Sequence, residues 1–283
     1  MFGAIIGDII GSTREFRHIK TKEFALFPKG SDYTDDTIMT IAIGDALIEG
    51  LSKGGDLHKY FIDSMQRYGR KYSHPLGAYG KGFANWLRSN NPEPYNSCGN
   101  GSAMRVSPCA MVARSLDEAL DLAKQSAEVT HNHPEGIKGA QATAAAIYLA
   151  QIGATKDEIA AYIRDNYYQM GRTLDEIRPK YHFEGSCQKS VPQSIVAFLE
   201  STDYEDAIRN TISLGGDADT MGAITGSIAW AYYGRDLIPT DMDDLWRKAK
   251  KHVPDELVDR LFAFLDFCEK RTQRTSIWYE VNR

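Results

Sequence analysis

Glycines recur at every fourth position in two apolar stretches, and this spacing is the strongest constraint on the fold. Gly3, Gly7 and Gly11 would lie on one face of a helix, and Gly222 with Gly226 repeats the spacing late in the chain. A face without side chains lets a neighbouring backbone approach closely. Because each glycine costs a helix about 1 kcal/mol, we expect tight packing or a nearby functional site to compensate.

Apolar residues recur at helical spacing in two further segments. One pattern runs through Met39, Ala42, Ile43, Ala46 and Leu47, and the other through Leu257, Leu261, Phe264, Leu265 and Cys268. This periodicity is typical of helices with one face in a core. The sequence contains neither alternating strands joined by hairpin turns nor a Gly-x-Gly-x-x-Gly turn after a strand. We therefore predict an all-α bundle.

Helix starts are marked by a hydroxyl residue followed three positions later by glutamate. This capping box satisfies two free backbone N–H groups at a helix N-terminus. It occurs at Ser115 with Glu118, Thr155 with Glu158, Thr173 with Glu176, and Thr202 with Glu205. Residues 92–94 and 178–192 have the composition of longer surface loops, and we expect these loops to flank a cleft.

The composition favours one globular body. A chain of 283 residues with 42% hydrophobic content can bury a sizeable core, and we interpret residues 1–283 as a single domain. The net charge of −5 and the lack of a long basic block argue against nucleic-acid binding. The densest basic stretch, residues 247–251, is interpreted as a solvated helix end.

The cysteines and the N-terminus bear on the cellular compartment. Cys98, Cys109, Cys187 and Cys268 are too scattered for a zinc or dithiol motif, which fits free thiols in a reducing compartment. The N-terminal residues show no charged leader or cleavage site, and no apolar run is long enough to cross a membrane. We expect a soluble, cytoplasmic monomer with no membrane partner.

Two acidic clusters stand at the starts of apolar helices. Thr34-Asp35-Asp36 precedes the first periodic helix, and Asp217-Ala218-Asp219-Thr220 follows a glycine turn. Either cluster alone is explained by helix capping. Four carboxylates brought together near a core would repel one another and resist ionisation, and divalent cations would relieve that repulsion. Oxygen ligands without nearby His or Cys suit Mg²⁺ or Mn²⁺, and also Ca²⁺. This interpretation assumes that the two clusters meet in space.

Two more acids precede these clusters. Asp8 lies inside an apolar run, where an unpaired charge would be costly. It could be the partner of a backbone group or cation, or it could support the metal site from behind. Glu15 follows seven residues later, on the same face if the helix continues. Because Arg14 and Arg17 are its neighbours, Glu15 could equally form an ion pair at the surface.

A glycine-rich turn and two histidines provide further candidates for ligand contact. Gly99-Asn100-Gly101-Ser102 opens a helical stretch, so its backbone N–H groups could receive an anion such as pyrophosphate. Ser102 as a simple helix cap is the alternative. His131 and His133 lack a third ligand at metal-site spacing. We interpret them as polar contacts to a substrate or as capping residues.

These residues, taken in order, resemble the ADP-ribosylglycohydrolase family, the group related to ADP-ribosyl-dinitrogenase reductase hydrolase. The resemblance spans nearly the whole chain. Its motifs are Gly3-Ala4-Ile5-Ile6-Gly7-Asp8 with Glu15, Thr34-Asp35-Asp36, Gly99-Asn100-Gly101-Ser102-Ala103-Met104-Arg105, Thr130-His131, and Gly216-Asp217-Ala218-Asp219-Thr220. The last of these motifs is highly specific.

The resemblance implies a single-domain orthogonal helical bundle with a binuclear Mg²⁺ or Mn²⁺ centre. The metal ligands it implies are Thr34, Asp35, Asp36, Asp217, Asp219 and Thr220. Catalysis would involve Asp36 and Asp219, with Glu15 as general acid or base. Substrate would be held by Gly99, Asn100, Gly101, Ser102, Met104 and His131. The reaction it implies is hydrolysis of the glycosidic bond of an ADP-ribosylated protein or of a small ADP-ribose conjugate.

Two features of residues 74–99 bear on what the resemblance implies. Some relatives that act on serine-linked ADP-ribose have an aromatic residue before the Gly-Asn-Gly turn, where this chain has Cys98. Residues 74–99 contain one acid, Glu93, so any further carboxylate that this segment contributes to the site would have to be Glu93. Two alternatives remain open: a non-catalytic ADP-ribose-binding or structural protein on the same scaffold, and a metal-dependent hydrolase of another nucleotide conjugate or phosphoester.

Overall fold

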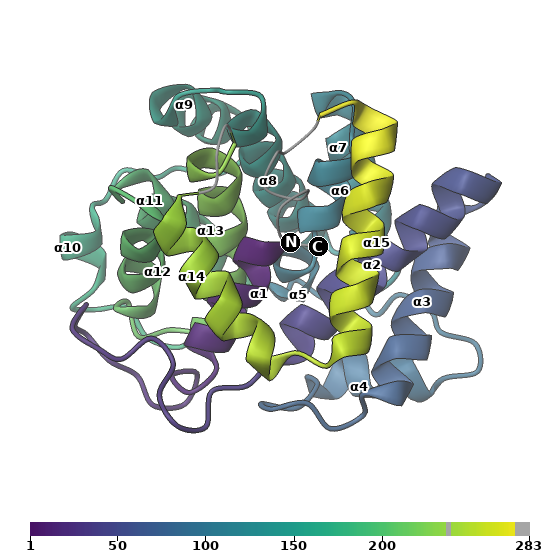
Figure 1. Ribbon diagram of the computed structural model, residues 1–283, viewed down its shortest axis with the longest axis horizontal. Coiled ribbons are helices and arrows are strands. Elements are labelled where there is room, and N and C mark those ends of the chain that lie inside the picture. Colours follow the sequence, from purple (N-terminus) through teal and green to yellow (C-terminus); the bar gives the residue numbers. More distant parts are fainter. Residues whose placement is uncertain (236–238, 275–283) are drawn as a thin grey trace.

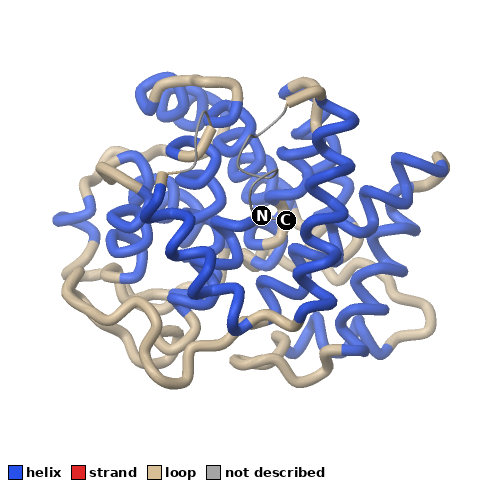
Figure 2. The backbone as a smooth tube through the Cα atoms, in the orientation of Figure 1, coloured by secondary structure: helices blue, strands red, loops and turns tan. Residues whose placement is uncertain are grey.

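The computed structural model describes residues 1–235 and 239–274, and these residues form helices joined by loops, without a strand (Figure 2). Two isolated bridges pair Thr34 with Leu76 and Gly99 with Ser186. The predicted all-α class is confirmed. The helices are α1 (Phe2–Gly11), α2 (Asp35–Lys53), α3 (Leu57–Lys71), α4 (Lys81–Arg88), α5 (Gly101–Met104), α6 (Ser107–Val112), α7 (Leu116–Glu128), α8 (Pro134–Gln151), α9 (Lys156–Asn166), α10 (Leu174–Ile177), α11 (Cys187–Leu199), α12 (Tyr204–Ile212), α13 (Ala218–Tyr233), α14 (Thr240–Ala249), the 3₁₀ turn η1 (Lys250–His252) and α15 (Asp255–Thr272).

The glycine spacing brings α1 and α13 into direct backbone contact near the centre of the molecule (Figure 1). A Cβ built on Gly3 would lie 2.1 Å from the carbonyl oxygen of Gly226, and one on Gly7 would lie 2.0 Å from that of Gly222. At Gly11 the carbonyl oxygen of Ala218 would lie 2.3 Å away. No side chain fits at these positions, so the tight packing expected from the sequence is confirmed. The contact places the start of α13 beside the end of α1.

The two periodic helices form much of the rest of the core. All ten residues of the predicted apolar patterns in α2 and α15 are buried. The buried carboxylate of Asp45 on α2 joins neighbouring helices. It accepts hydrogen bonds from Arg67 (2.6 Å) and Tyr68 (3.2 Å) on α3 and pairs with Arg260 on α15. Pairing with two arginines offsets the cost of burying this charge.

The predicted capping boxes are confirmed at Thr155 and Thr173, where both reciprocal hydrogen bonds are present. Ser115 also caps α7, although Glu118 reaches back to the N–H of Arg114.

The prediction at Thr202 is wrong by one residue. Asp203 caps α12 instead, and the side chain of Asp206 accepts the N–H of Thr202. Aspartate is as good a cap as threonine, and two overlapping patterns therefore compete at this helix start.

Part of the loop predicted over residues 178–192 is helical. Residues 178–186 do form a connection, but α11 begins at Cys187 and includes Pro192. Proline is usually excluded from helix interiors because it lacks an N–H donor. Here it lies inside the helix, and its side chain is buried in the packed structure. Residues 92–94 lie in the connection between α4 and α5, as predicted.

Three further predictions concern the basic stretch, the cysteines and membrane spans. Arg247 and Lys248 lie in the last turn of α14 and are exposed, which confirms a helix end in the basic stretch. The four cysteines form no disulfide. Among the described helices, none combines the length and the apolar character needed to span a membrane.

Candidate active site

The two acidic clusters meet, as the sequence interpretation assumed. Asp35 and Asp36 begin α2, and Asp217 and Asp219 stand at the start of α13. The hydroxyl of Thr220 donates to Oδ2 of Asp36 across the junction (3.4 Å). One oxygen from each of three acids falls within 4.8 Å of the others in two groups: Asp8, Asp36 and Asp219 in one, Glu15, Asp217 and Asp219 in the other.

Asp8 holds the start of α2 in place. Its carboxylate is fully buried and accepts the backbone N–H groups of Thr34 (3.0 Å) and Thr37 (3.1 Å), and both threonine hydroxyls also donate to it. Burial raises the pKa of Asp8 to about 6, although these hydrogen bonds act in the opposite direction. The structure therefore places Asp8 as a partner of backbone groups, close behind the acids of α2.

Thr34 is a helix cap as well as a predicted metal ligand. Its side-chain oxygen accepts the N–H of Asp36 (3.2 Å), and its hydroxyl donates to Asp8 (2.8 Å). Thr34 is 1% exposed and does not line the cavity of about 430 Å³ that opens beside the acids. Asp35 is half-buried and does line it. The capping alternative is therefore true of Thr34, and it coexists with the convergence of acids.

Glu15 reaches the site by a different route from the one predicted. The first helix ends at Gly11, and the N–H of Arg14 bonds to the carbonyl of Gly11 in a turn. Glu15 therefore lies beyond the helix and not on its continuing face. Its half-buried carboxylate still joins Asp217 and Asp219. Burial, with the negative charges of Asp217 and Asp8, raises the pKa of Glu15 to about 7.

The acids resist ionisation in one another's company. Burial and the neighbouring carboxylates raise the pKa of Asp35 to about 8 and hold those of Asp36 and Asp219 well above the usual range. The buried Oδ1 of Asp36 has no hydrogen-bond partner among the described residues. An orphaned carboxylate oxygen amid hard oxygen ligands fits a divalent cation. The residues present therefore suit Mg²⁺ or Mn²⁺.

A cavity of about 430 Å³ opens beside the acids and is bordered on another side by the glycine turn. Asn100 ties the turn to the acids, because its side-chain amide donates to Oδ2 of Asp217 (2.9 Å). Gly99, Gly101 and Met104 also line the cavity. Ser102 does not: it is fully buried, and its hydroxyl donates to the carbonyl of Gly136 (2.7 Å).

The two histidines have different surroundings. His133 caps α8, with its Nδ1 accepting the N–H of Glu135 (3.0 Å). His131 lines the cavity and is 5% exposed. Burial and the nearby cation of Arg105 hold the pKa of His131 well below its usual value, so its ring is neutral. The two alternatives left open for the histidines thus apply to one residue each, with His131 positioned for ligand contact.

One wall of the cavity was not predicted from the sequence. Residues 77–82 line it together with Tyr95, Phe16 and Phe183. The signal in the sequence was glycine at 77, 80 and 82, and the bridge between Thr34 and Leu76 holds this loop beside α2. The rings of Phe16 and Phe183 stack at 6.2 Å with both side chains exposed.

Neither residue singled out between 74 and 99 contacts the cavity. Cys98 lies just before the glycine turn, and its carbonyl accepts the N–H of Cys187. Glu93 is exposed and accepts a hydrogen bond from Asn91. Neither is among the residues that border the space. Aromatic surface at the site therefore comes from other segments than the position before the Gly-Asn-Gly turn.

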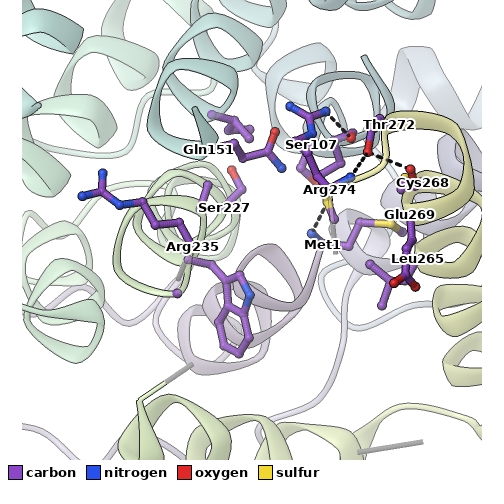
Figure 3. Close-up of a pocket in the computed structure, with 15 residues that line it drawn as sticks. Met1, Ser107, Gln151, Ser227, Arg235, Leu265, Cys268, Glu269, Thr272 and Arg274 are labelled. Carbon is purple, nitrogen blue, oxygen red and sulfur yellow. Dashed lines mark hydrogen bonds between the residues drawn. The ribbon is translucent and has the colours of Figure 1, made fainter. Parts of the chain in front are cut away.

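A second cavity, of about 110 Å³, lies beside Met1 and between α6, α8, α13 and α15 (Figure 3). Met111, Trp230 and Leu265 give it apolar walls, and Gln151 and Arg274 border it with polar groups. Trp230 is on the late turns of α13, whereas the acidic cluster is at its start, so roughly 15 Å of helix separates them at 1.5 Å per residue. None of the clustered acids faces this second cavity.

Comparison with known proteins identifies the family of this chain. The sequence model of the ADP-ribosylglycohydrolase family matches residues 1–271. ADP-ribosylarginine hydrolase Tri1 of Pseudomonas putida is 26% identical, with 92% of this chain and 77% of the relative covered. Human ADP-ribosylhydrolase ARH3 is 27% identical, with 84% and 85% covered. A solved ADP-ribosylglycohydrolase-related protein complex contains a chain with the same fold, at a TM-score of 0.63 and 24% identity, covering 88% of this chain and 95% of that one. This chain belongs to the ADP-ribosylglycohydrolase family.

Proposed function

We propose that the protein hydrolyses the glycosidic bond between ADP-ribose and an acceptor, either a protein side chain or a small adduct. Its family and its relatives indicate an ADP-ribosylhydrolase. The observation that carries the proposal for this chain is the Asn100 to Asp217 hydrogen bond. It joins a turn suited to an anion directly to the cluster of acids.

We further propose two Mg²⁺ or Mn²⁺ ions as cofactors. Their protein ligands would come from the facing helix starts: Thr34, Asp35, Asp36, Asp217, Asp219 and Thr220. The orphaned oxygen of Asp36 and the raised pKa values of the acids support this assignment. When bound, such cations supply Lewis acidity toward sugar hydroxyls and water, and they stabilise charge near the bond that breaks. Asp36 and Asp219 would contribute to catalysis by holding this centre.

The chain's own groups complete the proposed chemistry. Glu15, with its pKa raised to about 7, can hold or release a proton near neutral pH, so we assign it the acid or base role. Gly99, Asn100 and Gly101 border the cavity where the pyrophosphate would lie, and Met104 and His131 line it beside them. Ser102 would support this turn from behind through Gly136.

The acceptor is the open part of the proposal. One relative is named an ADP-ribosylarginine hydrolase, and the other is named only an ADP-ribosylhydrolase. Both arginine-linked and serine-linked ADP-ribosyl peptides should therefore be tested, with Mg²⁺, with Mn²⁺ and with chelator. We expect free ADP-ribose, identified by mass, from at least one linkage and only with a divalent cation.

Asp36→Asn is the matched variant, because it keeps size while removing a carboxylate, and Asp244→Asn is its control on the exposed face of α14. Loss of release in the first variant alone supports the proposal. Release of AMP or phosphate would instead indicate a hydrolase of another nucleotide conjugate. ADP-ribose binding without turnover of any linkage would indicate a non-catalytic binder.

A further inference from the structure

Arg105, Thr130 and His131 form a buried hydrogen-bond chain that ends at the cavity. A terminal nitrogen of Arg105 donates to the Thr130 hydroxyl oxygen (2.7 Å), which lies 2.7 Å from Nδ1 of His131. We infer that Arg105 and Thr130 are positioning residues that fix the tautomer of His131, so that its Nε2–H donates to a phosphate oxygen of the bound ligand. The inference rests on the proposed function only for the identity of that ligand.

The direction of the chain follows from its first member. A guanidinium can only donate, so the Thr130 oxygen must accept from Arg105. Thr130 is fully buried, and no other hydrogen-bond acceptor reaches its hydroxyl from the described part of the chain. If Nδ1 of His131 carried the proton, the hydroxyl hydrogen would be buried without an acceptor, at a cost of about 1–3 kcal/mol. The hydroxyl therefore donates to Nδ1, and the ring proton resides on Nε2.

Nε2 points toward the glycine turn. It lies 3.2 Å from the position where a Cβ on Gly101 would stand and 3.5 Å from that on Gly99. The ring of Tyr95 packs against His131 with centroids 5.9 Å apart, which limits its rotation. Glycine at these positions leaves room for a ligand oxygen beside Nε2. A side chain at either position would stand against the imidazole.

The charge on Arg105 serves the same arrangement. This guanidinium is 1% exposed, lies over the ring of Phe83, and pairs with no carboxylate among the described residues. Burial lowers the pKa of Arg105 only to about 10, so it remains a cation at neutral pH. Burial, followed by the charge of Arg105, lowers the pKa of His131 and opposes a second proton on its ring. The imidazole thus stays neutral and offers one donor of fixed direction.

The direct test is the tautomer of His131, read from ¹⁵N-¹H correlation spectra of the ¹⁵N-histidine-labelled full chain. We expect protonated Nε2 and unprotonated Nδ1 in the wild-type protein. Thr130→Val removes the hydroxyl at nearly constant size, and Thr130→Ser retains it. Thr143→Val is the control, because Thr143 is also buried but its hydroxyl has no partner among the described residues.

Thr130→Val should give mixed tautomers and weaken ADP-ribose binding, measured by calorimetry, by roughly 2- to 10-fold, the value of one hydrogen bond. Thr130→Ser and Thr143→Val should keep the wild-type tautomer and affinity. A wild-type ring protonated on Nδ1 overturns the inference even if Thr130→Val fails to fold. An unchanged tautomer in a folded Thr130→Val protein overturns it as well.

The tautomer readout requires neither turnover nor ligand. A wild-type protein that neither binds nor hydrolyses ADP-ribose conjugates would contradict the proposed function, while the spectra would still decide whether Thr130 sets the state of His131.

Discussion

The side-chain amide of Asn100 donates a 2.9 Å hydrogen bond to Oδ2 of Asp217. Asn100 is 7% exposed and Asp217 is 6% exposed, so this charge-assisted bond lies largely out of water. It fixes the distance between the glycine turn and the start of α13. Any substrate that spans both must match that spacing.

Replacing Asn100 by aspartate should disable the site. Asn100→Asp keeps the shape of the side chain but sets a second carboxylate against Asp217. Loss of a hydrogen bond to a charged group costs about 1.5–3 kcal/mol, so we expect release of ADP-ribose to fall by roughly 10- to 100-fold. Steady-state assays at saturating Mg²⁺ measure this. Asn85→Asp, on the exposed side of α4, should leave the rate unchanged, and equal rates in both variants would contradict the prediction.

The contact between α1 and α13 should not tolerate a methyl group. Gly7→Ala would place Cβ 2.0 Å from the carbonyl oxygen of Gly222, so the two helices would have to separate. We expect a loss of about 1–3 kcal/mol or more in the free energy of unfolding, measured by urea denaturation. At Gly171 nothing lies within 4 Å, and Gly171→Ala should be neutral or slightly stabilising. Similar stability of the two variants would show that the backbone contact does not limit the fold.

The metal-free protein should lose stability as pH rises. The pKa values of Asp8, Glu15 and Asp35 are raised to about 6, 7 and 8, with burial as the largest cause, from ordinary values of 3.8 to 4.5. Between the ordinary pKa values and the raised ones, the folded state therefore binds more protons than the unfolded state. That contribution to stability is complete below about pH 4 and disappears by about pH 8. The melting temperature in chelator should fall across this range.

Mg²⁺ or Mn²⁺ should restore that stability, and most strongly at the alkaline end of the range. A cation at 100 times its dissociation constant adds about 2.7 kcal/mol. Asp36→Asn should show a much smaller melting shift with metal, whereas Asp244→Asn should match the wild-type protein. A pH-independent melting temperature in chelator, or no shift with either cation, would refute the electrostatic account of the cluster.

Acid should weaken the ion pair between Glu118 on α7 and Arg271 on α15. Arg271 donates to Glu118 at 2.6 Å, and the N–H of Arg114 also donates to this carboxylate at 2.6 Å. Burial raises the pKa of Glu118, but these hydrogen bonds and the guanidinium charges outweigh it and lower the pKa from 4.5 to about 2. The stabilisation is complete above pH 4.5 and disappears as pH falls toward 2.

Glu118→Gln should therefore destabilise the protein at pH 7 by about 1.5–3 kcal/mol. The difference from wild type should shrink between pH 4.5 and 2 in urea titrations. Glu23→Gln, at an exposed position, should show no such difference at any pH. A penalty for Glu118→Gln that stays constant down to pH 2 would contradict the prediction.

Local patterns in the sequence were sufficient to predict much of the fold. The spacing of Gly3, Gly7 and Gly11 predicted a close backbone contact, and apolar periodicity predicted α2 and α15. These features depend on residues within a few turns of one another. The prediction at Thr202 was wrong because the neighbouring Asp203 caps α12 instead. The loop predicted over residues 178–192 was partly wrong because Pro192 is buried inside α11.

The candidate site divides in the same way. Its residue types already indicated hard metal ligands and an anion-binding turn, because that chemistry is carried by single side chains and short motifs. The sequence could not show which partner each side chain meets. Thr34 and Ser102 are buried, and their hydroxyls donate to groups of the protein itself. Glu15 lies in a turn after the first helix, and residues 77–82 form one wall of the cavity.

The sequence by itself determined the helical class, the backbone contact and the acidic chemistry of this protein. Only the tertiary structure decided that Asp36 and Asp219 share one site and that the hydroxyl of Thr130 lies within hydrogen-bond distance of both Arg105 and His131. The physical reason is range. Helix propensity, capping and glycine spacing act between near neighbours in the chain, whereas burial, repulsion between acids and the direction of a proton depend on residues that folding alone brings together.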